Sequence, residues 1–324
     1  MTGFRAAVAA LFALSGVARA EDARTRVTVE DFGTTYVTHL DTAPYPDPMN
    51  PVWANTVLVF VPEHFQPEPS VSFVVHFHGF ATTPSGGVEA MRGRQQLVLS
   101  GRNAILVSPQ CPMSRRATHS GKLARPGGFR RLLEDVVRFL EARGHVAAGA
   151  QVGPVLVTAH SGAFEMAADA ILQGDAPVVE VAMLDALYGR HDAFAEWLSQ
   201  DPARRFVSLA SEGALPDRWK GRLTALLDER GIDYRVERRE GQLSRADLTD
   251  ARVLFLTNRG AHFACVYYHL TLRDILEASP LPRAVDTGWS TDLARRPRLI
   301  ERYRAPGAAS TVARRQVVRK STPN

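Results

Sequence analysis

Ser161 lies where the sequence changes from one periodicity to another. The run VLVT before it is typical of a buried strand that ends at Ala159, and GAFEMAADAIL after it has the spacing of a helix. A serine on such a turn can be displayed as a nucleophile if the residues two before and two after it are small, and here these are Ala159 and Ala163. A serine in this place could instead cap the helix by accepting hydrogen bonds from its first free amides. The local sequence leaves both roles open.

The residues around Ser161 depart from the G-x-S-x-G pattern of displayed nucleophiles, because alanine replaces both outer glycines. Alanine is the next smallest residue, so the steric requirement is still met. A second His-Ser-Gly string, at Ser120, has no strand before it and no helix after it. The surrounding elements therefore favour Ser161 over Ser120.

A serine hydroxyl needs a base to accept its proton and preorganised donors to hold the oxyanion that forms. The strand SVSFVVHFHGF ends in a glycine turn, where the amide of Phe80 is the expected first donor, and the amide of Gly162 at the helix start is the expected second. His262 follows the last predicted strand and is the expected base, because from there it can reach back to Ser161. The flanking residues expected to support these groups are His78, Gly79 and His160.

The elements that must position these groups alternate between short apolar runs and longer amphipathic stretches, which predicts an α/β sheet with helices on both faces. The predicted strands are near 27–39, 55–61, 72–78, 104–108, 154–159, 178–184, 205–210 and 251–257. The predicted helices are near 87–100, 128–143, 162–173, 190–199, 216–230 and 263–277. The first two strands adjoin without a helix, so we expect an antiparallel start to a mostly parallel, eight-stranded sheet. The short connection 185–204 excludes a large cap domain, and the irregular segment 109–128 is a candidate binding loop.

Four segments, HFHGF, AHSGA, LDALYG and GAHF, together resemble the α/β-hydrolase fold superfamily, and the resemblance covers roughly residues 55–277. It implies a serine hydrolase with the chain order nucleophile, acid, histidine, most often an esterase or lipase and less often a peptidase or amidase. The enzyme class expected from it is a carboxylic ester hydrolase that forms an acyl-enzyme and needs no cofactor and no metal.

The acid of this triad has three candidates. In the superfamily it usually follows the seventh strand, where Glu212 and Asp217 lie, but some lipases use an aspartate after the sixth, where Asp185 ends an apolar strand. A buried carboxylate needs a partner to stay ionised, and a histidine that becomes charged is such a partner. The expected order is therefore Asp185, then Glu212, then Asp217.

The two ends of the chain differ from its body. Residues 1–20 have an early arginine, an apolar middle too short to span a bilayer and a small-residue end, which predicts a signal peptide cleaved after Ala20 and an exported (periplasmic or secreted) protein. Residues 21–290 then form the hydrolase domain. Residues 291–324 form a basic tail that is expected to be poorly ordered, with nine Lys or Arg and one acidic residue in 295–320.

The charge distribution also bounds the partners. Because the net charge of +5 comes from the tail and the signal peptide, and no motif supports it, nucleic-acid binding is not expected. The tail could make a weak electrostatic contact with an anionic surface, although a solvated end is the favoured interpretation. The expected substrate is a small-molecule, lipid or polymer ester.

The two cysteines, Cys111 and Cys265, invite a disulfide in an exported chain. In the strand order that the resemblance implies they lie about five strand spacings apart, on the order of 24 Å. A disulfide needs Cα atoms within about 7 Å, so two unpaired thiols are predicted.

Two other interpretations compete with a serine hydrolase. His76 and His78 point the same way on one strand, as the ligands of a metal-dependent hydrolase would, but zinc needs three or four ligands and no further cluster follows nearby. An exported, non-catalytic binding protein on a hydrolase scaffold would carry a degraded catalytic set, because fold does not fix function. Here Ser161, His262 and the oxyanion turn are all present.

Overall fold

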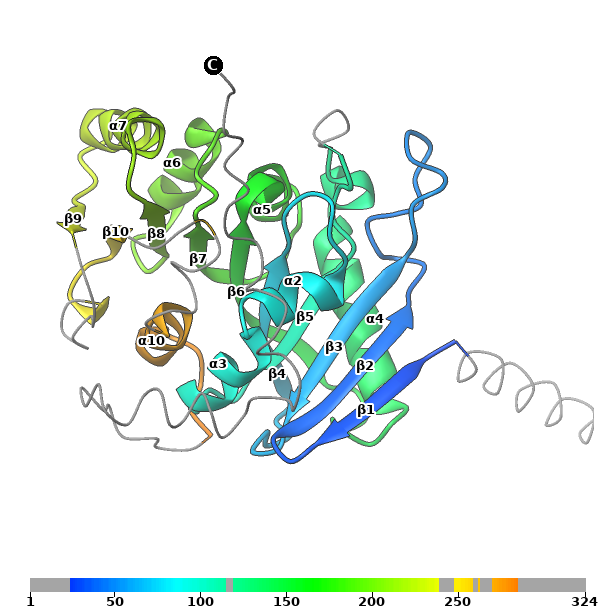
Figure 1. Cartoon of the computed structure of the whole chain (residues 1–324). Coiled ribbons are helices and arrows are strands. Elements are labelled where there is room, and N and C mark those ends of the chain that lie inside the picture. The colour runs from blue at the N-terminus through cyan, green and yellow to red at the C-terminus, as the bar shows by residue number, and fades with distance from the viewer. Residues whose placement is uncertain (1–23, 115–118, 239–247, 259–261, 263–269, 285–324) are drawn as a thin grey trace, which may run out of the picture. The chain divides into compact units, whose positions relative to one another are not determined.

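The structure is a computed structural model that describes residues 24–114, 119–238, 248–258, 262 and 270–284 (Figure 1). The predicted signal peptide, the basic tail and Cys265 lie outside the described residues, as do the boundaries of the predicted domain. Cys111 is a buried free thiol. No helix among the described ranges is long and apolar enough to cross a membrane.

The strands form one sheet in the order β1-β2-β3-β5-β4-β6-β7-β8-β10-β9. β1 to β3 and the β3–β5 pair are antiparallel, as the adjoining early strands predicted, and every pair from β5 to β9 is parallel. The bounds are β1 Arg26–Glu30, β2 Gly33–His39, β3 Thr56–Pro62, β4 Ser70–Phe77, β5 Ile105–Pro109, β6 Gln151–His160, β7 Val178–Leu184, β8 Arg205–Ser211, β9 Arg235–Arg238 and β10 Val253–Asn258.

The prediction of eight strands is therefore wrong, because this mixed sheet has ten strands within the described residues alone. The run predicted as one strand over 27–39 is broken by a turn at Asp31 and Phe32, and its two halves pair with each other as β1 and β2. The strand β9 has the sequence RVER, which lacks the apolar run that marks a buried strand, because it pairs only at the edge of the sheet.

The helices cover both faces of the sheet, as predicted. The interval 87–100 contains two helices rather than one, because Arg92 has a left-handed backbone (φ 52°) that ends the helical path between them. Of the helix predicted over 263–277, the described part is α10. The bounds are α2 Pro84–Ala90, α3 Gly93–Ser100, α4 Gly128–Glu141, α5 Phe164–Leu172, α6 His191–Gln200, α7 Ala214–Glu229 and α10 Thr271–Ala278, with short 3-10 turns η1 Gly121–Ala124 and η2 Ser161–Ala163.

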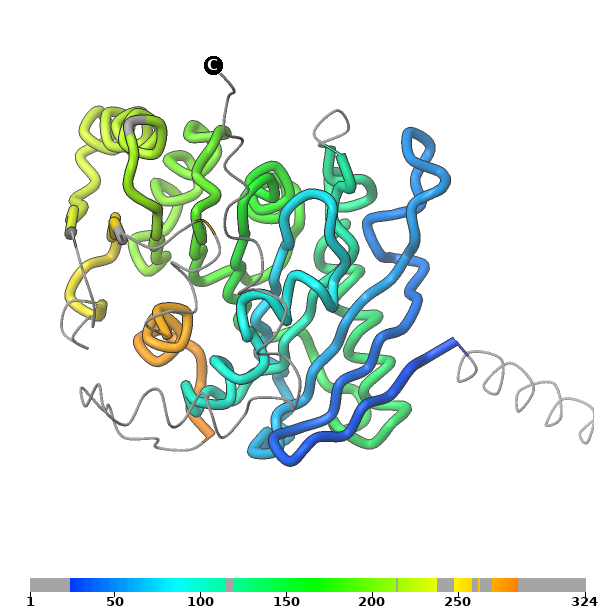
Figure 2. Tube along the Cα trace, viewed as in Figure 1, coloured from blue at the N-terminus to red at the C-terminus, as the bar shows by residue number. Residues whose placement is uncertain are grey.

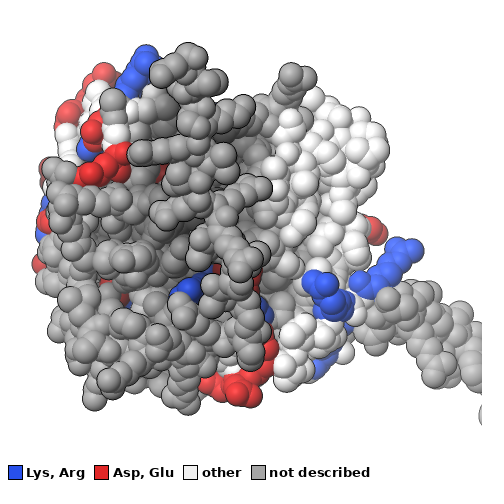
Figure 3. Space-filling view, in the orientation of Figure 1, with Lys and Arg blue, Asp and Glu red and all other residues white. Residues whose placement is uncertain are grey.

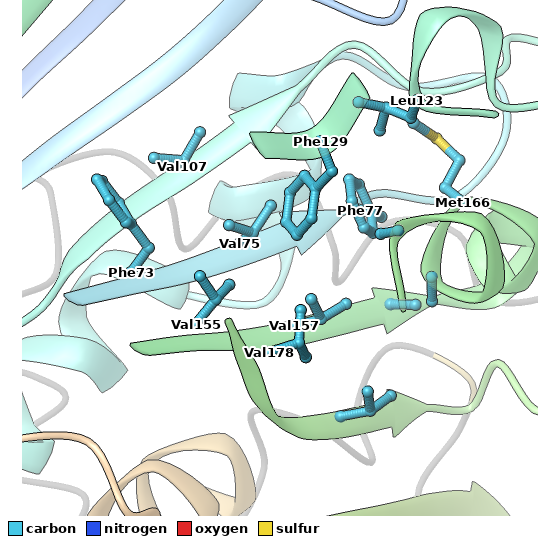
Figure 4. Close-up of a cluster of buried hydrophobic side chains, with 14 of the residues drawn as sticks. Phe73, Val75, Phe77, Val107, Leu123, Phe129, Val155, Val157, Met166 and Val178 are labelled. Atoms are coloured by element: carbon cyan, nitrogen blue, oxygen red, sulfur yellow. The ribbon is translucent and has the colours of Figure 1, made fainter. Parts of the chain in front are cut away.

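The main core lies between the sheet and the helices α4 to α7. Alternate residues of β4, namely Val71, Phe73, Val75 and Phe77, face this side, because successive side chains of a strand point to opposite faces. Figure 4 shows Phe77 packed close to Phe129 of α4, and the two ring centroids are 5.9 Å apart. Burying each such side chain contributes about 1.5–3 kcal/mol. The opposite face is covered by α2, α3 and α10, and α10 packs against α3.

The connections that follow the parallel strands converge at one edge of the sheet. The trace in Figure 2 shows the loops after β6, β7 and β8 at the same end of the sheet as the excursion 40–55 between β2 and β3. β3 is antiparallel to β5, with Val57 opposite Pro109, so this excursion meets the carboxyl end of β5. In an open α/β sheet the carboxyl edge is where binding sites form.

Candidate active site

Ser161 directly follows β6 and has a left-handed backbone, with φ of 57°. A residue other than glycine in this conformation stores about 1–3 kcal/mol of strain, which the surrounding structure must hold. The N-cap position of α5 is taken by Ala163, and among the described residues no side chain caps either η2 or α5. The alternative role of Ser161 as a helix cap is therefore wrong, and the residue is instead a strained, half-buried corner between strand and helix.

The corner fits against the turn after β4 because both contain glycine. A Cβ atom on Gly79 would lie 2.9 Å from the Cβ of Ser161, and one on Gly162 would lie 2.1 Å from the ring of Phe80. The small residues expected on either side, Ala159 and Ala163, are both buried. The structure thus brings the two predicted oxyanion donors, Phe80 and Gly162, to adjacent places beside Ser161.

Asp185 lies at the end of β7, with 3% of its surface exposed and φ of 47°. The Nδ1–H of His262 donates to its Oδ2 over 2.7 Å. Ser211 donates from its Oγ to the same oxygen over 2.8 Å and from its backbone N–H to Oδ1 over 3.4 Å. Burial alone would raise the pKa of Asp185, but the hydrogen bonds from His262 and Ser211 outweigh it and hold the pKa below its usual range. The carboxyl is therefore an ionised partner for His262.

The other two candidate acids have different surroundings, although Asp217 lines the same pocket as Asp185. Asp217 is in the first turn of α7 and pairs with Lys220, with 2.7 Å between Oδ1 and Nζ. Glu212 is exposed just after β8. Of the three candidates, Asp185 is the one with a hydrogen bond to His262 in the part of the chain that the structure describes.

His160 contacts His262 directly. The two ring centroids are 4.5 Å apart, and the Nε2–H of His160 is placed to donate to the backbone carbonyl of His262 over 3.3 Å. Burial is the main cause that lowers the pKa of His160 to about 4. The ring is therefore neutral near pH 7, where it adds no positive charge beside His262 and holds its loop in place.

The two histidines at the end of β4, His76 within it and His78 directly after it, have other partners. His76 lies 2.9 Å from the hydroxyl of Thr158, measured from Nδ1. His78 donates from Nδ1 to the carbonyl of Gly79 over 2.8 Å and accepts at Nε2 from the backbone N–H of Cys111 over 3.0 Å. No three His, Cys, Asp or Glu side chains in the described ranges come together as a metal site would require. The contacts of His78 instead tie the turn after β4 to the end of β5.

Ser211 is the residue that the sequence analysis missed. The candidates after β8 were carboxylates alone, whereas Ser211 is the small polar residue that ends this strand. Its position is the available signal, because Ser211 ends β8, β8 pairs with β7, and Asp185 directly follows β7. A hydroxyl there can hold the carboxylate that orients a histidine, as second partners commonly do.

Buried titratable groups predict how stability depends on pH. Burial lowers the pKa of His78 and of His160 to about 4, so the folded chain excludes protons that the unfolded chain binds below pH 6.5. Their contribution to stability is present above pH 6.5 and is lost as the pH falls toward 4, by about 1.4 kcal/mol per pH unit for each histidine. Glu180 acts in the opposite direction, because burial raises its pKa to about 7 despite Arg205 and Arg102.

The contribution of Glu180 is present below pH 4.5 and is lost as the pH rises through about 7. Glu180→Gln should therefore steepen the rise of the unfolding free energy between pH 4.5 and 6.5 by about 1.4 kcal/mol per pH unit. Urea unfolding at several pH values measures this slope for both proteins. Parallel curves would show that Glu180 keeps an ordinary pKa in the folded chain.

Comparison of the sequence with known families and with curated proteins finds no match. Among solved structures, the chain is similar to a ferulic acid esterase, with 12% identity, 78% of this chain and 97% of the other covered, and a TM-score of 0.49. It is also similar to an S-formylglutathione hydrolase from Agrobacterium tumefaciens (12%, 77% and 95%, 0.45) and to the enterobactin and salmochelin hydrolase IroE (14%, 76% and 97%, 0.44). Each of these TM-scores is below 0.5, so the description of the fold rests on the strand order given above.

Proposed function

We propose that this chain is a serine hydrolase that cleaves carboxylic esters through an acyl-enzyme. The observation that carries the proposal is the hydrogen bond of 2.7 Å between Asp185 and His262, because it lies at the same edge of the sheet as the strained corner at Ser161. An oriented histidine beside a displayed serine is the arrangement that activates a hydroxyl. The preference for esters over amides follows the superfamily resemblance of the segments around these residues.

The proposed reaction has two stages, acylation of Ser161 and then deacylation. The Oγ of Ser161 attacks the ester carbonyl carbon while Nε2 of His262 takes its proton, and the backbone amides of Phe80 and Gly162 hold the oxyanion. His262 then gives that proton to the departing alcohol, which leaves Ser161 acylated. Water, deprotonated by His262, attacks the acyl group and releases the acid. Asp185 stays ionised throughout and stabilises the imidazolium.

Export is part of the same proposal. The support for it is the sequence of residues 1–20, and the expected mature chain begins at Glu21. The natural substrate is proposed at the level of its class, an ester of a small molecule, a lipid or a polymer.

A fluorophosphonate tests the nucleophile. It phosphonylates only an activated serine, so the intact mass of the wild-type protein should rise by one adduct, carried by the peptide that contains Ser161. Ser161→Ala and His262→Ala should stay unmodified, while Ser120→Ala should label like the wild type. The intact mass of the exported protein also tests whether the chain begins at Glu21. A folded wild type that takes no adduct, or an adduct that persists in Ser161→Ala, would overturn the assignment.

A further inference from the structure

Three segments at the carboxyl edge of the sheet carry almost no charge. Residues 42–55 contain a single charged side chain, Asp47, and residues 78–88 and 109–114 contain none. The carboxylate of Asp47 is 7% exposed and accepts from the backbone N–H of Asn50 over 2.9 Å, so its charge is turned inward. We call the surface of these three segments the uncharged face.

The uncharged face also exposes large apolar side chains. Met49 is 74% exposed, Val52 is 88% exposed and Met113 is 38% exposed. Figure 3 shows a broad region without Lys, Arg, Asp or Glu at the upper right, where the excursion 40–55 lies in Figure 1. A single exposed apolar residue is ordinary, but several on segments whose described residues carry almost no charge are typical of a site that meets an apolar partner.

Hydrogen bonds anchor the excursion 40–55, which carries Met49 and Val52, to the rest of the chain. The hydroxyl of Tyr45 donates to the carbonyl of His119 over 2.6 Å, and the side-chain amide of Asn50 lies 2.6 Å from Nε2 of the same histidine. The backbone N–H of Lys122 donates to the carbonyl of Pro44 over 2.9 Å, and a Cβ on Gly121 would lie 2.2 Å from that oxygen. These bonds join the excursion 40–55 to the loop after β5.

The uncharged face is continuous with the proposed catalytic site. The segment 78–88 contributes to both, because it includes Phe80, whose ring packs on Gly162 beside Ser161. His78 in the same segment binds the backbone of Cys111, which lies in the third segment of the face. A partner bound to this face would therefore lie next to Ser161.

We propose that the uncharged face adsorbs to a dispersed, water-insoluble, uncharged ester, which the site then hydrolyses at the surface of the droplet. This inference rests on the proposed function and names its substrate class. The absence of charge is what fits an uncharged ester phase, because burying an unpaired charge against an apolar surface is costly. An anionic membrane would instead call for a cluster of Lys or Arg among the described residues of this face, and the ammonium of Lys122 beside it donates to the backbone carbonyl of Asp41 over 2.7 Å.

Adsorption can be measured apart from catalysis in the Ser161→Ala protein. Flotation with emulsified tributyrin should place this protein in the droplet fraction, and adding Met49→Glu and Val52→Glu should lower its partition coefficient at least about tenfold, because two charges would then have to be desolvated. The matched control is Val29→Glu. Val29 is 75% exposed on β1, and its pairing with Thr34 of β2 places it near the opposite end of the sheet. Its partition should match that of the parent.

Salt separates this adsorption from attraction by the basic tail. Adsorption through the uncharged face should persist between about 0.05 M and about 0.5 M NaCl, whereas attraction between exposed charges is screened over that range. Loss of adsorption in high salt, or equal adsorption of the double Glu variant and its parent, would overturn the inference.

Turnover with the active serine present distinguishes this inference from the proposed function. The ratio of activity on emulsified tributyrin to activity on dissolved p-nitrophenyl acetate should fall at least about tenfold in the double Glu variant. It should stay constant in Val29→Glu. If the wild type hydrolyses the dissolved ester and the double variant has the same activity ratio as the wild type, the adsorption inference fails and the proposed function stands. A wild type that binds droplets but hydrolyses neither ester would defeat the proposed function and, with it, the substrate class.

Discussion

Ser161→Ala is expected to lower kcat for a dissolved ester by roughly 10⁵- to 10⁶-fold, which is the scale seen when a triad loses its nucleophile. The reason is that no other group replaces the hydroxyl in the acyl transfer, and the oxyanion donors alone supply only a residual acceleration over water. Steady-state hydrolysis with purified protein measures the loss, and burst kinetics of the wild type would report the acyl-enzyme.

Ser120→Ala is the matched control for Ser161→Ala. Ser120 lies in the second His-Ser-Gly string, and its hydroxyl is buried without a hydrogen-bond partner among the described residues. Its removal breaks no bond there, so turnover should stay within about twofold of the wild type. If Ser161→Ala kept its turnover while Ser120→Ala lost it, the corner after β6 would be a structural feature and the nucleophile would lie in the other string.

Asp185→Asn is expected to lower kcat by about 10⁴-fold while leaving the fold intact. Asparagine keeps the size of the side chain, but its amide cannot stabilise the imidazolium of His262 and favours the wrong tautomer when it donates to Nδ1. The variant can keep the contact with Ser211, because an amide oxygen also accepts from a hydroxyl. A loss of turnover with an unchanged unfolding temperature therefore measures the role of the charge.

Glu212→Gln and Asp217→Asn supply the comparison for Asp185→Asn. Both residues are exposed, and Asp217 already pairs with Lys220, so each substitution should change kcat/KM by no more than about twofold. Full turnover in Asp185→Asn together with a large loss in Glu212→Gln would reverse the order of the candidate acids.

The elements could be predicted wherever one local signal dominated. The strands β4 to β8 are apolar runs and α4 is a strongly amphipathic helix, and each was placed within a few residues. The prediction failed where pairing overrode the local pattern. β1 and β2 read as one strand because both halves have alternating β-formers, and only their mutual pairing reveals the turn between them. β9 exists because β10 offers it a partner.

The sequence by itself determined the corner at Ser161, since a strand, a small residue, a serine and a helix follow one another and the strain arises within a few residues. It also determined that segments 42–55, 78–88 and 109–114 carry almost no charge. Only the tertiary structure decided that Asp185 and His262, 77 residues apart, form a hydrogen bond and that Ser211 supports them. Such contacts depend on strand order and on closing long loops, which the free energy of the whole fold fixes and no local pattern encodes. The same holds for the uncharged face, because it forms only when β3 and β5 bring their ends together.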